Sequence, residues 1–441
     1  MRRVRTRLAA AMLAALLLPT LAHAAGYSIY EQGAAALGMA GAATASVNDA
    51  SAVFFNPAAM TRLDGTRFYV GASALQPVTK FTGQDPYPGA DGSAEMARQT
   101  FYPPTVYATH SWKKGFAVGA GFNSPFGLGV QWDPETFLGS YLVTKADLKA
   151  LNASLCLAYA PNTMWSFAAG GDVMWARVGL KNQIYRDLSA YALGTRHVAD
   201  VELTSDYTPA PGWNAAVLFT PTSEWKLGAY YRSKVVVHVD MLSGEADFTN
   251  IPIGAPYGAV DAALAAVLRD QRVSTVLRFP AMWSLGAAWN PKPEWTVEAD
   301  FNLHEWKVFS DLPIDFGNAL TPDKRKVENY SNAWQARTGA EYRRGSLAYR
   351  AGYYFDKSPA PVNSVTPLLP DADRHGLTLG LGCALGTDKR WTVDVYELAI
   401  FARSRVGVAL ETDLPASPRA EFTGEYKTFV NAVGLGLGYR W

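Results

Sequence analysis

The C-terminal end of the chain carries the pattern that decides the fold: Val433-Gly434-Leu435-Gly436-Leu437-Gly438-Tyr439-Arg440-Trp441. An apolar or aromatic side chain stands at every second position of this stretch, with Gly or Arg between them. Because successive side chains of a strand point to opposite faces, this period of two predicts a strand with one apolar face. Taken alone, the pattern also fits an ordinary last strand of a soluble sheet.

The same period of two, rather than the 3.6 of a helix, recurs from residue 67 onward. The clearest examples are Trp213-Ala215-Val217-Phe219, Trp225-Leu227-Ala229-Tyr231, Trp295-Val297-Ala299-Phe301-Leu303 and Leu347-Tyr349-Ala351-Tyr353-Phe355, each with polar residues between. Strands of a soluble sandwich alternate in the same way. The alternation therefore predicts an all-β chain and leaves the architecture open.

The connections between the predicted strands decide the architecture. Every second connection is short and rich in turn residues: 160–163, 221–223, 291–293, 344–345 and 386–388. Long polar connections lie between them, near 76–104, 127–147, 181–210, 234–273, 304–333, 356–375 and 402–424. Short turns at one rim and long loops at the other are typical of a transmembrane antiparallel β-barrel of the outer membrane. The segments predict about fourteen strands, an even number as expected for such barrels.

Aromatic residues support a membrane setting. Trp165, Trp225, Trp295 and Trp391 each follow a short turn directly, where they would form the girdle at one membrane interface. In this setting the final aromatic residue, Trp441, suits the terminal strand through which the barrel assembly machinery recognises such proteins. We therefore expect the chain to lie in the bacterial outer membrane, in contact with its lipid.

The composition excludes several other classes. Of the 441 residues, 49% are hydrophobic and 18% charged, and the mean hydropathy is −0.04. Apart from the N-terminal end, the chain has no apolar run of the length that a membrane helix needs. The 22 Tyr, 20 Phe and 13 Trp argue against disorder. Lys+Arg 40 against Asp+Glu 39 gives no basic surface for nucleic acid.

Residues 1–24 are predicted to be a secretory signal peptide. Arg2, Arg3, Arg5 and Arg7 precede an apolar segment from Leu8 to Leu18, and Ala22-His23-Ala24 follows as a small-residue cleavage box. A membrane anchor is the alternative, although the apolar segment is short for a span. Cys156 and Cys383 fall on opposite faces of their predicted strands, so we expect both thiols to be free.

Residues 25–66 lack the alternation and precede the barrel, which we assign to residues 67–441. Gly33, Gly38 and Gly41 lie among many Ala and Ser residues, and small residues let backbone segments pack closely. About fourteen strands enclose a lumen too wide for wall side chains to fill. This segment is therefore predicted to plug the lumen; a periplasmic extension outside the pore is the alternative.

Several short motifs resemble the long-chain fatty acid transporter family of Gram-negative outer membranes. They occur in order along residues 25–441: Ala25-Gly26-Tyr27, Asn56-Pro57-Ala58, Phe279-Pro280-Ala281-Met282-Trp283, Asp356-Lys357-Ser358-Pro359-Ala360-Pro361, Leu369-Pro370-Asp371-Ala372-Asp373-Arg374 and the C-terminal strand. Relatives in this family include channels for fatty acids and for aromatic or other hydrophobic hydrocarbons. The resemblance implies a fourteen-stranded barrel whose lumen holds an N-terminal hatch, here residues 25–66 with Asn56, Pro57 and Ala58. It also implies passive transport of hydrophobic compounds.

The resemblance further implies that cargo leaves sideways through a gap in the wall. Asn123-Ser124-Pro125-Phe126-Gly127, at the end of the third predicted strand, matches the distortion that forms this lateral gate. The residue types suit the role, because Pro lacks a ladder donor and Gly tolerates a kink. The alternative is that Pro125 simply begins a loop.

Capture is expected at the long loops. Asp261 to Arg269 is rich in helix formers with little charge, and Leu264, Val267 and Leu268 would offer an apolar surface for ligand. The preceding long loop could supply a facing wall through Tyr185, Leu188, Tyr191 and Leu193. A helix that caps the barrel mouth without binding is the alternative.

A fatty acid also needs a partner for its carboxylate, and Arg suits this task. The candidates are Arg177, Arg350 and Arg374, each of which could instead form a lumenal ion pair with Glu341, Asp356 or Asp373. Where the resemblance predicts a basic residue just before Trp334, this chain has Ser331. That departure weakens the fatty-acid hypothesis relative to a neutral hydrocarbon.

The sequence offers little for catalysis. The histidines are scattered without metal-ligand spacing, and there is no nucleophile elbow or phosphate loop. We expect no cofactor and no metal. A barrel enzyme and an adhesin or structural barrel are the alternatives to a channel, which we expect to act as a monomer on a hydrophobic small molecule.

Overall fold

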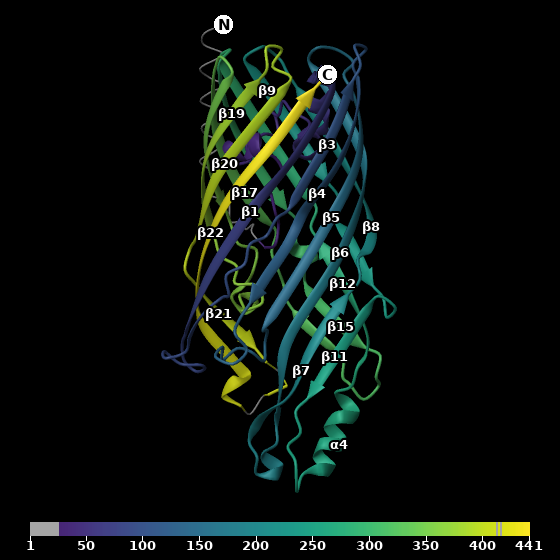
Figure 1. Cartoon of the computed structure of the whole chain (residues 1–441), viewed down its shortest axis with the longest axis vertical. Helices are drawn as coiled ribbons and strands as arrows, with labels where there is room; N and C mark the ends of the chain where they lie inside the picture. Colours follow the sequence, from purple (N-terminus) through teal and green to yellow (C-terminus); the bar gives the residue numbers. More distant parts are fainter. Residues whose placement is uncertain (1–25, 412, 415–416) are drawn as a thin grey trace.

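The computed structural model describes residues 26–411, 413–414 and 417–441, so the predicted signal peptide lies outside the described residues. Fourteen long antiparallel strands form a closed barrel (Figure 1). In chain order they are β1 (Gly65–Gly83), β3 (Pro104–Ser111), β4 (Phe116–Gln131), β5 (Lys145–Tyr159), β6 (Trp165–Asp187), β8 (Thr208–Phe219), β9 (Trp225–Arg232), β13 (Met282–Lys292), β14 (Trp295–His304), β17 (Ala333–Arg344), β18 (Leu347–Asp356), β19 (Arg374–Leu385), β20 (Trp391–Ala402) and β22 (Glu421–Arg440). The predicted all-β architecture, an antiparallel barrel of about fourteen strands, is confirmed.

The C-terminal strand closes the barrel against the first strand. β22 pairs with β1 from Arg67↔Arg440 to Gly83↔Gly424 without interruption. The predicted faces are correct, since Leu435 is 48% exposed while the alternating glycines point inward and are buried. A side chain at Gly436 would collide with the Tyr69 hydroxyl, so glycine is required there.

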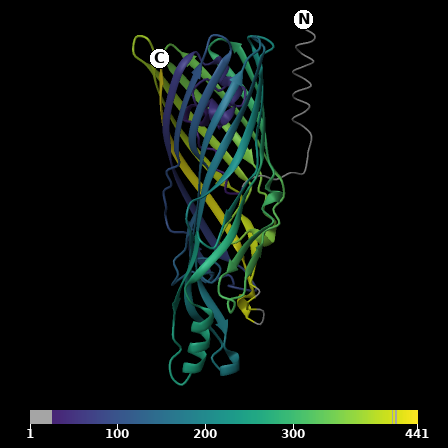
Figure 2. The same cartoon turned by 90° about the vertical axis from the view of Figure 1, so that its right-hand side faces the viewer.

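The two ends of the barrel differ as the sequence predicts. Short turns join strands at one end, whereas the long connections at the other end build a sheet extension and a helix (Figure 2). The extension contains β2 (Ser93–Glu95), β7 (Thr195–Ser205), β10 (Val235–Val239), β11 (Gly244–Asn250), β12 (Gln271–Phe279), β15 (Asp311–Phe316), β16 (Lys324–Val327) and β21 (Arg405–Leu410). The helix is α4 (Gly258–Val267), and four 3₁₀ turns lie in these connections: η2 (Ser189–Tyr191), η3 (Trp306–Val308), η4 (Val362–Ser364) and η5 (Pro418–Ala420).

Some predicted loop boundaries are wrong. β1 continues to Gly83, β4 to Gln131 and β6 to Asp187, through residues that the sequence pattern assigns to long loops. These strand ends pair with loop strands such as β2 and β7. Beyond the apolar band of the membrane one face no longer needs apolar residues, so the alternation fades while the strand continues.

Side-chain exposure fits the predicted membrane setting. Trp165 is 38% exposed, Trp295 39% and Trp391 53%, all next to the short turns. Cys156 and Cys383 are both free. Within the described ranges, helices that are long and apolar enough to cross a membrane are absent.

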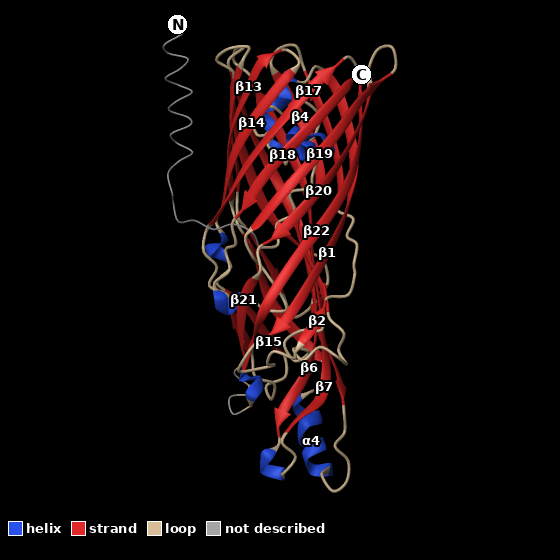
Figure 3. Ribbon diagram, turned by 90° about the vertical axis from the view of Figure 1, so that its left-hand side faces the viewer, coloured by secondary structure: helices blue, strands red, loops and turns tan. Residues whose placement is uncertain are grey.

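The N-terminal segment from Gly26 to Asp64 lies inside the barrel, toward the end with the short turns (Figure 3). It contains α2 (Ala34–Gly38), α3 (Ala52–Phe55) and the 3₁₀ helix η1 (Pro57–Arg62). α2 packs on β18, β19, β20 and β22, and η1 packs on β3, β4, β5, β6 and β8, which lie across the lumen. The segment therefore contacts opposite walls of the barrel.

Candidate functional site

Two inward-facing carboxylates on β14 hold the middle of the N-terminal segment. Asp300 Oδ2 accepts hydrogen bonds from Ala43 N at 2.9 Å, Thr44 N at 3.0 Å and Thr44 Oγ1 at 2.7 Å. Glu298 Oε1 accepts one from Ala45 N at 2.6 Å. Four hydrogen bonds from the segment's backbone and one hydroxyl therefore end on two neighbouring wall residues, and they fix the segment to the wall.

The backbone of the N-terminal segment approaches the wall closely at two glycines, where no side chain stands between them. A Cβ on Gly352 of β18 would lie 2.5 Å from the carbonyl carbon of Met39. A Cβ on Gly380 of β19 would lie 2.6 Å from the Cα of Gly38. The wall thus accepts the segment only where β18 and β19 carry glycine.

The Asn56-Pro57-Ala58 motif sits at a helix start inside the lumen. Asn56 Oδ1 accepts a hydrogen bond from Ala58 N at 3.0 Å, which caps η1, and Pro57 takes the first helical position. Asn56 Nδ2 donates to Thr44 O at 2.7 Å and to Val217 O of β8 at 3.2 Å. One side chain therefore joins two parts of the segment to the wall.

The Asn123–Gly127 stretch forms a bulge inside β4, and the expectation that it ends the strand is wrong. Asn123 pairs with Asn152 and Phe126 pairs with Ala150, so β4 carries one extra residue there. On its other side, β4 stops pairing with β3 at Val106↔Phe122. The strand continues because β5 still supplies partners on one edge.

The beginning of the N-terminal segment covers the edge of β4 that β3 leaves free. Ile29 N donates to Pro125 O at 2.8 Å, and Gly127 N donates to Tyr27 O at 3.0 Å. Gln32 Nε2 donates to Ser124 O at 2.7 Å. The bulge and the N-terminal segment are therefore one structural unit.

A large cavity joins the lumen to this interrupted part of the wall. It encloses about 1500 Å³ of space not filled by atoms, including the part open to solvent. Its lining includes lumenal Arg337, Tyr354 and Arg374 as well as Tyr102 and Leu151 at the wall. Since Leu151 lies one position from inward-facing Ala150 and Asn152, it belongs to the outer face of β5. The cavity thus reaches through the wall between β3 and β4.

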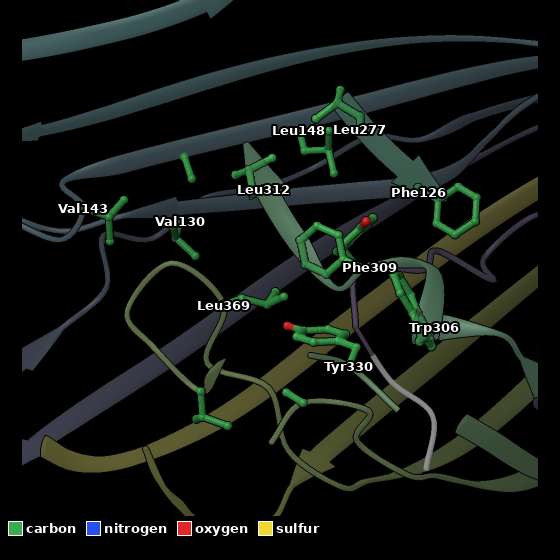
Figure 4. Packing of buried hydrophobic residues seen from close by; sticks show 14 of the residues in the cluster. Phe126, Val130, Val143, Leu148, Leu277, Trp306, Phe309, Leu312, Tyr330 and Leu369 are labelled. Atoms are coloured by element: carbon green, nitrogen blue, oxygen red, sulfur yellow. The ribbon is translucent and has the colours of Figure 1, made fainter. Parts of the chain in front are cut away.

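An apolar cluster leads into this cavity from the long-loop side. Tyr27, Phe126, Phe279, Trp306 and Phe309 pack edge-on or tilted, with the Phe126 and Phe279 ring centroids 4.9 Å apart. Figure 4 shows Phe126, Trp306 and Phe309 of this cluster. A second cavity, with about 540 Å³ of space not filled by atoms including the part open to solvent, borders the same cluster. It shares Tyr27 and several leucines with the first cavity.

The second cavity carries one buried carboxyl, Glu328, in the connection between β16 and β17. Burial raises the pKa of Glu328, and Lys326 at 3.3 Å opposes this shift. Because burial favours the neutral form of Glu328, the stability that this protonated form contributes is lost as the pH rises through the raised pKa. The cavity therefore favours uncharged groups.

The three arginines predicted from the sequence occupy three different places. Arg374 lines the large cavity, where it pairs with Asp356 at 3.2 Å and donates to Gly26 O at 3.5 Å. Arg350 is buried beside α2 between Glu341 and Asp394, at 2.6 Å from each, as its lumenal ion-pair alternative requires. Arg177 lies on the outer face of β6, one position from inward-facing Ala176, with its side chain 42% exposed and 3.8 Å from Asp147, so the expected lumenal position is wrong.

Sequence reasoning missed Arg337 of β17, which lies beside Arg374 in the cavity. Its guanidinium stacks on the rings of Tyr30, at 4.0 Å, and Tyr354, at 4.6 Å, and donates to Ala40 O at 2.7 Å. The signal was available, because Arg337 shares the inward parity of Gln335 and Glu341. Ser331, where a basic residue is expected, instead contacts Pro359 O.

The predicted loop helix exists as α4, far from the cavity. Leu264 and Val267 are half-buried against Leu188, Leu193 and neighbouring residues of the η2 loop. Leu268 is 1% exposed and is buried within this contact. The two loops thus face each other, while Leu268 offers no free surface.

Comparisons with known proteins agree with this geometry. The family model described as "Outer membrane protein transport protein (OMPP1/FadL/TodX)" matches residues 15–441. A long-chain fatty acid transport protein of Escherichia coli O6:H1 is 27% identical over 406 residues, which cover 85% of this chain and 87% of the relative. A 47 kDa outer membrane protein of Pasteurella multocida is 25% identical over 436 residues, 95% of each chain.

Solved structures show the same fold. The crystal structure of a Pseudomonas aeruginosa FadL homologue superposes with a TM-score of 0.81 at 20% identity, covering 94% of this chain and all (100%) of the other. The toluene transporter TodX of P. putida superposes with a TM-score of 0.68 at 17% identity, covering 94% and 99%.

Proposed function

The chain belongs to the OMPP1/FadL/TodX family of outer membrane transport proteins, and we propose that it is a passive channel for long-chain fatty acids or related hydrophobic compounds. It resides in the outer membrane. The observation that carries the proposal is the cavity that runs from the apolar cluster through the β3–β4 gap. Relatives named as long-chain fatty acid transport proteins support the cargo class.

The physical benefit of such a channel lies in bypassing the polar outer leaflet. An apolar solute gains about 0.8 kcal/mol for each CH₂ that leaves water, but the sugar layer of the outer leaflet resists its entry. The cluster around Tyr27 and Phe309 offers an apolar surface within the barrel. Exit through the wall would release the solute into the membrane without returning it to water.

The lateral gate is the gap beside Asn123–Gly127. The extra residue in β4 and the early end of its pairing with β3 support this role. The N-terminal residues Tyr27 and Ile29, bound to the bulge, would move with it or frame its opening.

The N-terminal segment acts as the hatch. Its hydrogen bonds to Asp300, Glu298 and Val217 hold it across the lumen, between the cavity and the end of the barrel with the short turns. A hatch in this place would keep water and small polar solutes from crossing while cargo leaves sideways.

Capture takes place at the long loops. The half-buried Leu264 and Val267 of α4 and the exposed Tyr191 of the facing η2 loop would collect the solute before it reaches the cluster around Tyr27. We further propose that β22 is the strand that the barrel assembly machinery recognises and that the channel acts as a monomer.

A channel for neutral aromatic hydrocarbons is the second candidate. Arg374 is already paired with Asp356, and Gln335 and two aromatic rings hold the Arg337 guanidinium, so a ligand without a carboxylate leaves neither side chain without partners. The likeness to the toluene transporter TodX shows the fold alone. Transport rather than catalysis is also our proposal; the described residues contain no group of three or more His, Cys, Asp or Glu that could hold a metal.

Uptake by cells with and without the protein tests the function. Labelled oleate and a labelled alkylbenzene should each be compared with a small polar sugar. We expect protein-dependent uptake of at least one hydrophobic compound and none of the sugar. Sugar uptake without hydrophobic uptake would show a porin and contradict the proposal.

A further inference from the structure

We propose that the outer face of β5 and β6 binds the phosphate groups of an anionic lipid of the outer leaflet, at the edge of the apolar band nearer the long connections. The site consists of four cations, Lys145, Lys149, Arg177 and Lys181. It is distinct from the lumen and from the loop surface around α4, and it adjoins the gap in the wall.

Strand register brings these cations together in pairs. Lys145 lies opposite Lys181, and Lys149 lies opposite Arg177. Like charges directly opposite each other in neighbouring strands are destabilising. Two such pairs in succession on the same two strands therefore need anions to compensate them.

The acidic side chains nearby compensate only part of this charge. Asp147 lies 3.3 Å from Lys149 and 3.8 Å from Arg177, and Glu202 of β7 lies 3.4 Å from Lys181. Two carboxylates against four cations leave an excess of two positive charges. Such an excess suits a lipid headgroup with two phosphates.

The height of the cluster matches the headgroup level. Tyr159 marks the girdle next to the short turns, where it stacks on Phe116 at 4.5 Å. Ten residues of a strand tilted by about 40° rise about 25 Å, the height of the apolar band. Lys149 lies ten residues from Tyr159, and between them the outward-facing Leu155 and Leu157 are 61% and 67% exposed. The cations therefore begin where the apolar band ends.

A groove gives the cluster the shape of a site. Lys145, Arg177 and Lys181 line an open cleft with about 500 Å³ of space not filled by atoms, including the part open to solvent. Its lining also contains the two carboxylates, Asp147 and Glu202, and Thr204 and Ser205 of β7. The hydroxyl of Thr204 adds a neutral hydrogen-bond donor. Lysine and arginine on one wall and a hydroxyl on the other can surround a phosphate from several sides.

The site touches the gap but does not depend on transport. Asp147 and Lys149 line both the outer cluster and the large cavity. A lipid held there would form the edge of the opening on the β5 side. Its binding is measurable in a protein that carries no cargo.

The test measures lipid binding to the detergent-solubilised, full-length mature protein by native mass spectrometry. The probes are bisphosphorylated lipid A, the same lipid without phosphates, and inorganic phosphate. We expect the phosphorylated lipid to bind about tenfold more tightly than the dephosphorylated lipid. Equal binding of both lipids, or full displacement by millimolar inorganic phosphate, would overturn a lipid site.

Two charge variants locate the site. Lys149→Gln/Arg177→Gln/Lys181→Gln should weaken binding of the phosphorylated lipid about tenfold or more. The matched control, Lys113→Gln/Lys114→Gln/Lys292→Gln, removes the same charge from exposed lysines next to the short turns and should leave binding unchanged. Equal losses in both variants, or no loss in the first, would contradict the proposal.

One variant should act in the opposite direction. Asp147→Asn frees Lys149 and Arg177 from their shared carboxylate, so phosphorylated lipid should bind about threefold more tightly. A cluster that serves only to stabilise the barrel predicts no such gain. Heat-modifiable migration on gels verifies that each variant is folded.

Discussion

Two junctions in the same wall show opposite solutions to strand pairing. At the β1–β22 junction the ladder is unbroken from Arg67↔Arg440 to Gly83↔Gly424. At the β3–β4 junction pairing stops at Val106↔Phe122, although β4 runs on to Gln131. The first seals the barrel, while the second leaves an edge that the N-terminal segment covers from inside.

The difference follows from local sequence. β22 alternates glycine with apolar residues and pairs on both edges, with β1 and with β20. β4 contains Pro125, which has no N–H to donate, next to one extra residue. In this barrel the opening therefore lies where β4 has no partner strand on one edge and the N-terminal segment forms hydrogen bonds with the backbone groups of that edge.

The largest effect is expected from breaking the sealed junction. Leu435→Pro removes a backbone N–H donor from a strand that pairs on both edges, with β1 and with β20, where Pro is not tolerated. Folded protein, measured by heat-modifiable migration on gels, should fall to a small fraction of the wild-type amount. Leu435→Val is the control, and normal assembly of the Pro variant would contradict the difference between the junctions.

Making β4 regular should close the gap. Deletion of Ser124 combined with Pro125→Thr leaves one residue between Asn123 and Phe126, as β5 has between Asn152 and Ala150. Uptake of hydrophobic cargo should drop about tenfold or more with the barrel folded, if transport crosses the gap. Ser124→Ala, which keeps the bulge, should transport normally.

Normal uptake by the variant that lacks Ser124 would contradict a route through the gap and would indicate that the cargo passes the N-terminal segment instead. Gly127→Val is a poor test of closure, because a Cβ there would lie 2.7 Å from Ile29 Cδ1. It would disturb the segment as well as the strand.

Removing the N-terminal segment should open the lumen without disrupting the pairing of the barrel strands. Deletion of residues 26–62 from the mature chain should raise single-channel conductance in planar bilayers several-fold, because the wall side chains cannot fill a lumen of fourteen strands. Asp300→Asn, which weakens three hydrogen bonds to the segment, should give a smaller increase. Unchanged conductance in a folded deletion variant would exclude the hatch.

The smallest effect is expected from the two lumenal arginines. Arg374→Gln should change the ratio of oleate to alkylbenzene uptake about twofold to threefold, since Arg374 lines the cavity beside the gap. Arg350→Gln should leave that ratio unchanged and lower the thermal unfolding temperature, because it leaves Glu341 and Asp394 buried without their partner. Equal ratios in both variants would remove Arg374 from the cargo path.

The candidate site was only partly visible in the sequence. Asn56-Pro57-Ala58 and Asn123–Gly127 stand out as short motifs, and Arg350 and Arg374 follow from strand parity and a motif match. The alternation along a strand predicts which face a side chain is on, but it does not predict that Arg350 contacts two carboxylates while Arg374 lines a cavity. Phe279, Trp306 and Phe309 come from distant segments, so their meeting at Tyr27 had no sequence signal.

The sequence by itself determined the barrel. A period of two, alternating short and long connections and an aromatic last strand are patterns of residues close together in the chain, so they can be recognised without knowing which strands pair. Only the tertiary structure decided where the wall is interrupted. The gap depends on β3 ending at Val106↔Phe122 while β4 goes on, and on Tyr27 and Ile29 returning to cover Pro125 and Gly127. The contacts of Tyr27 and Ile29 with the bulge join segments about a hundred residues apart, and the residue pattern within either segment does not predict that they meet.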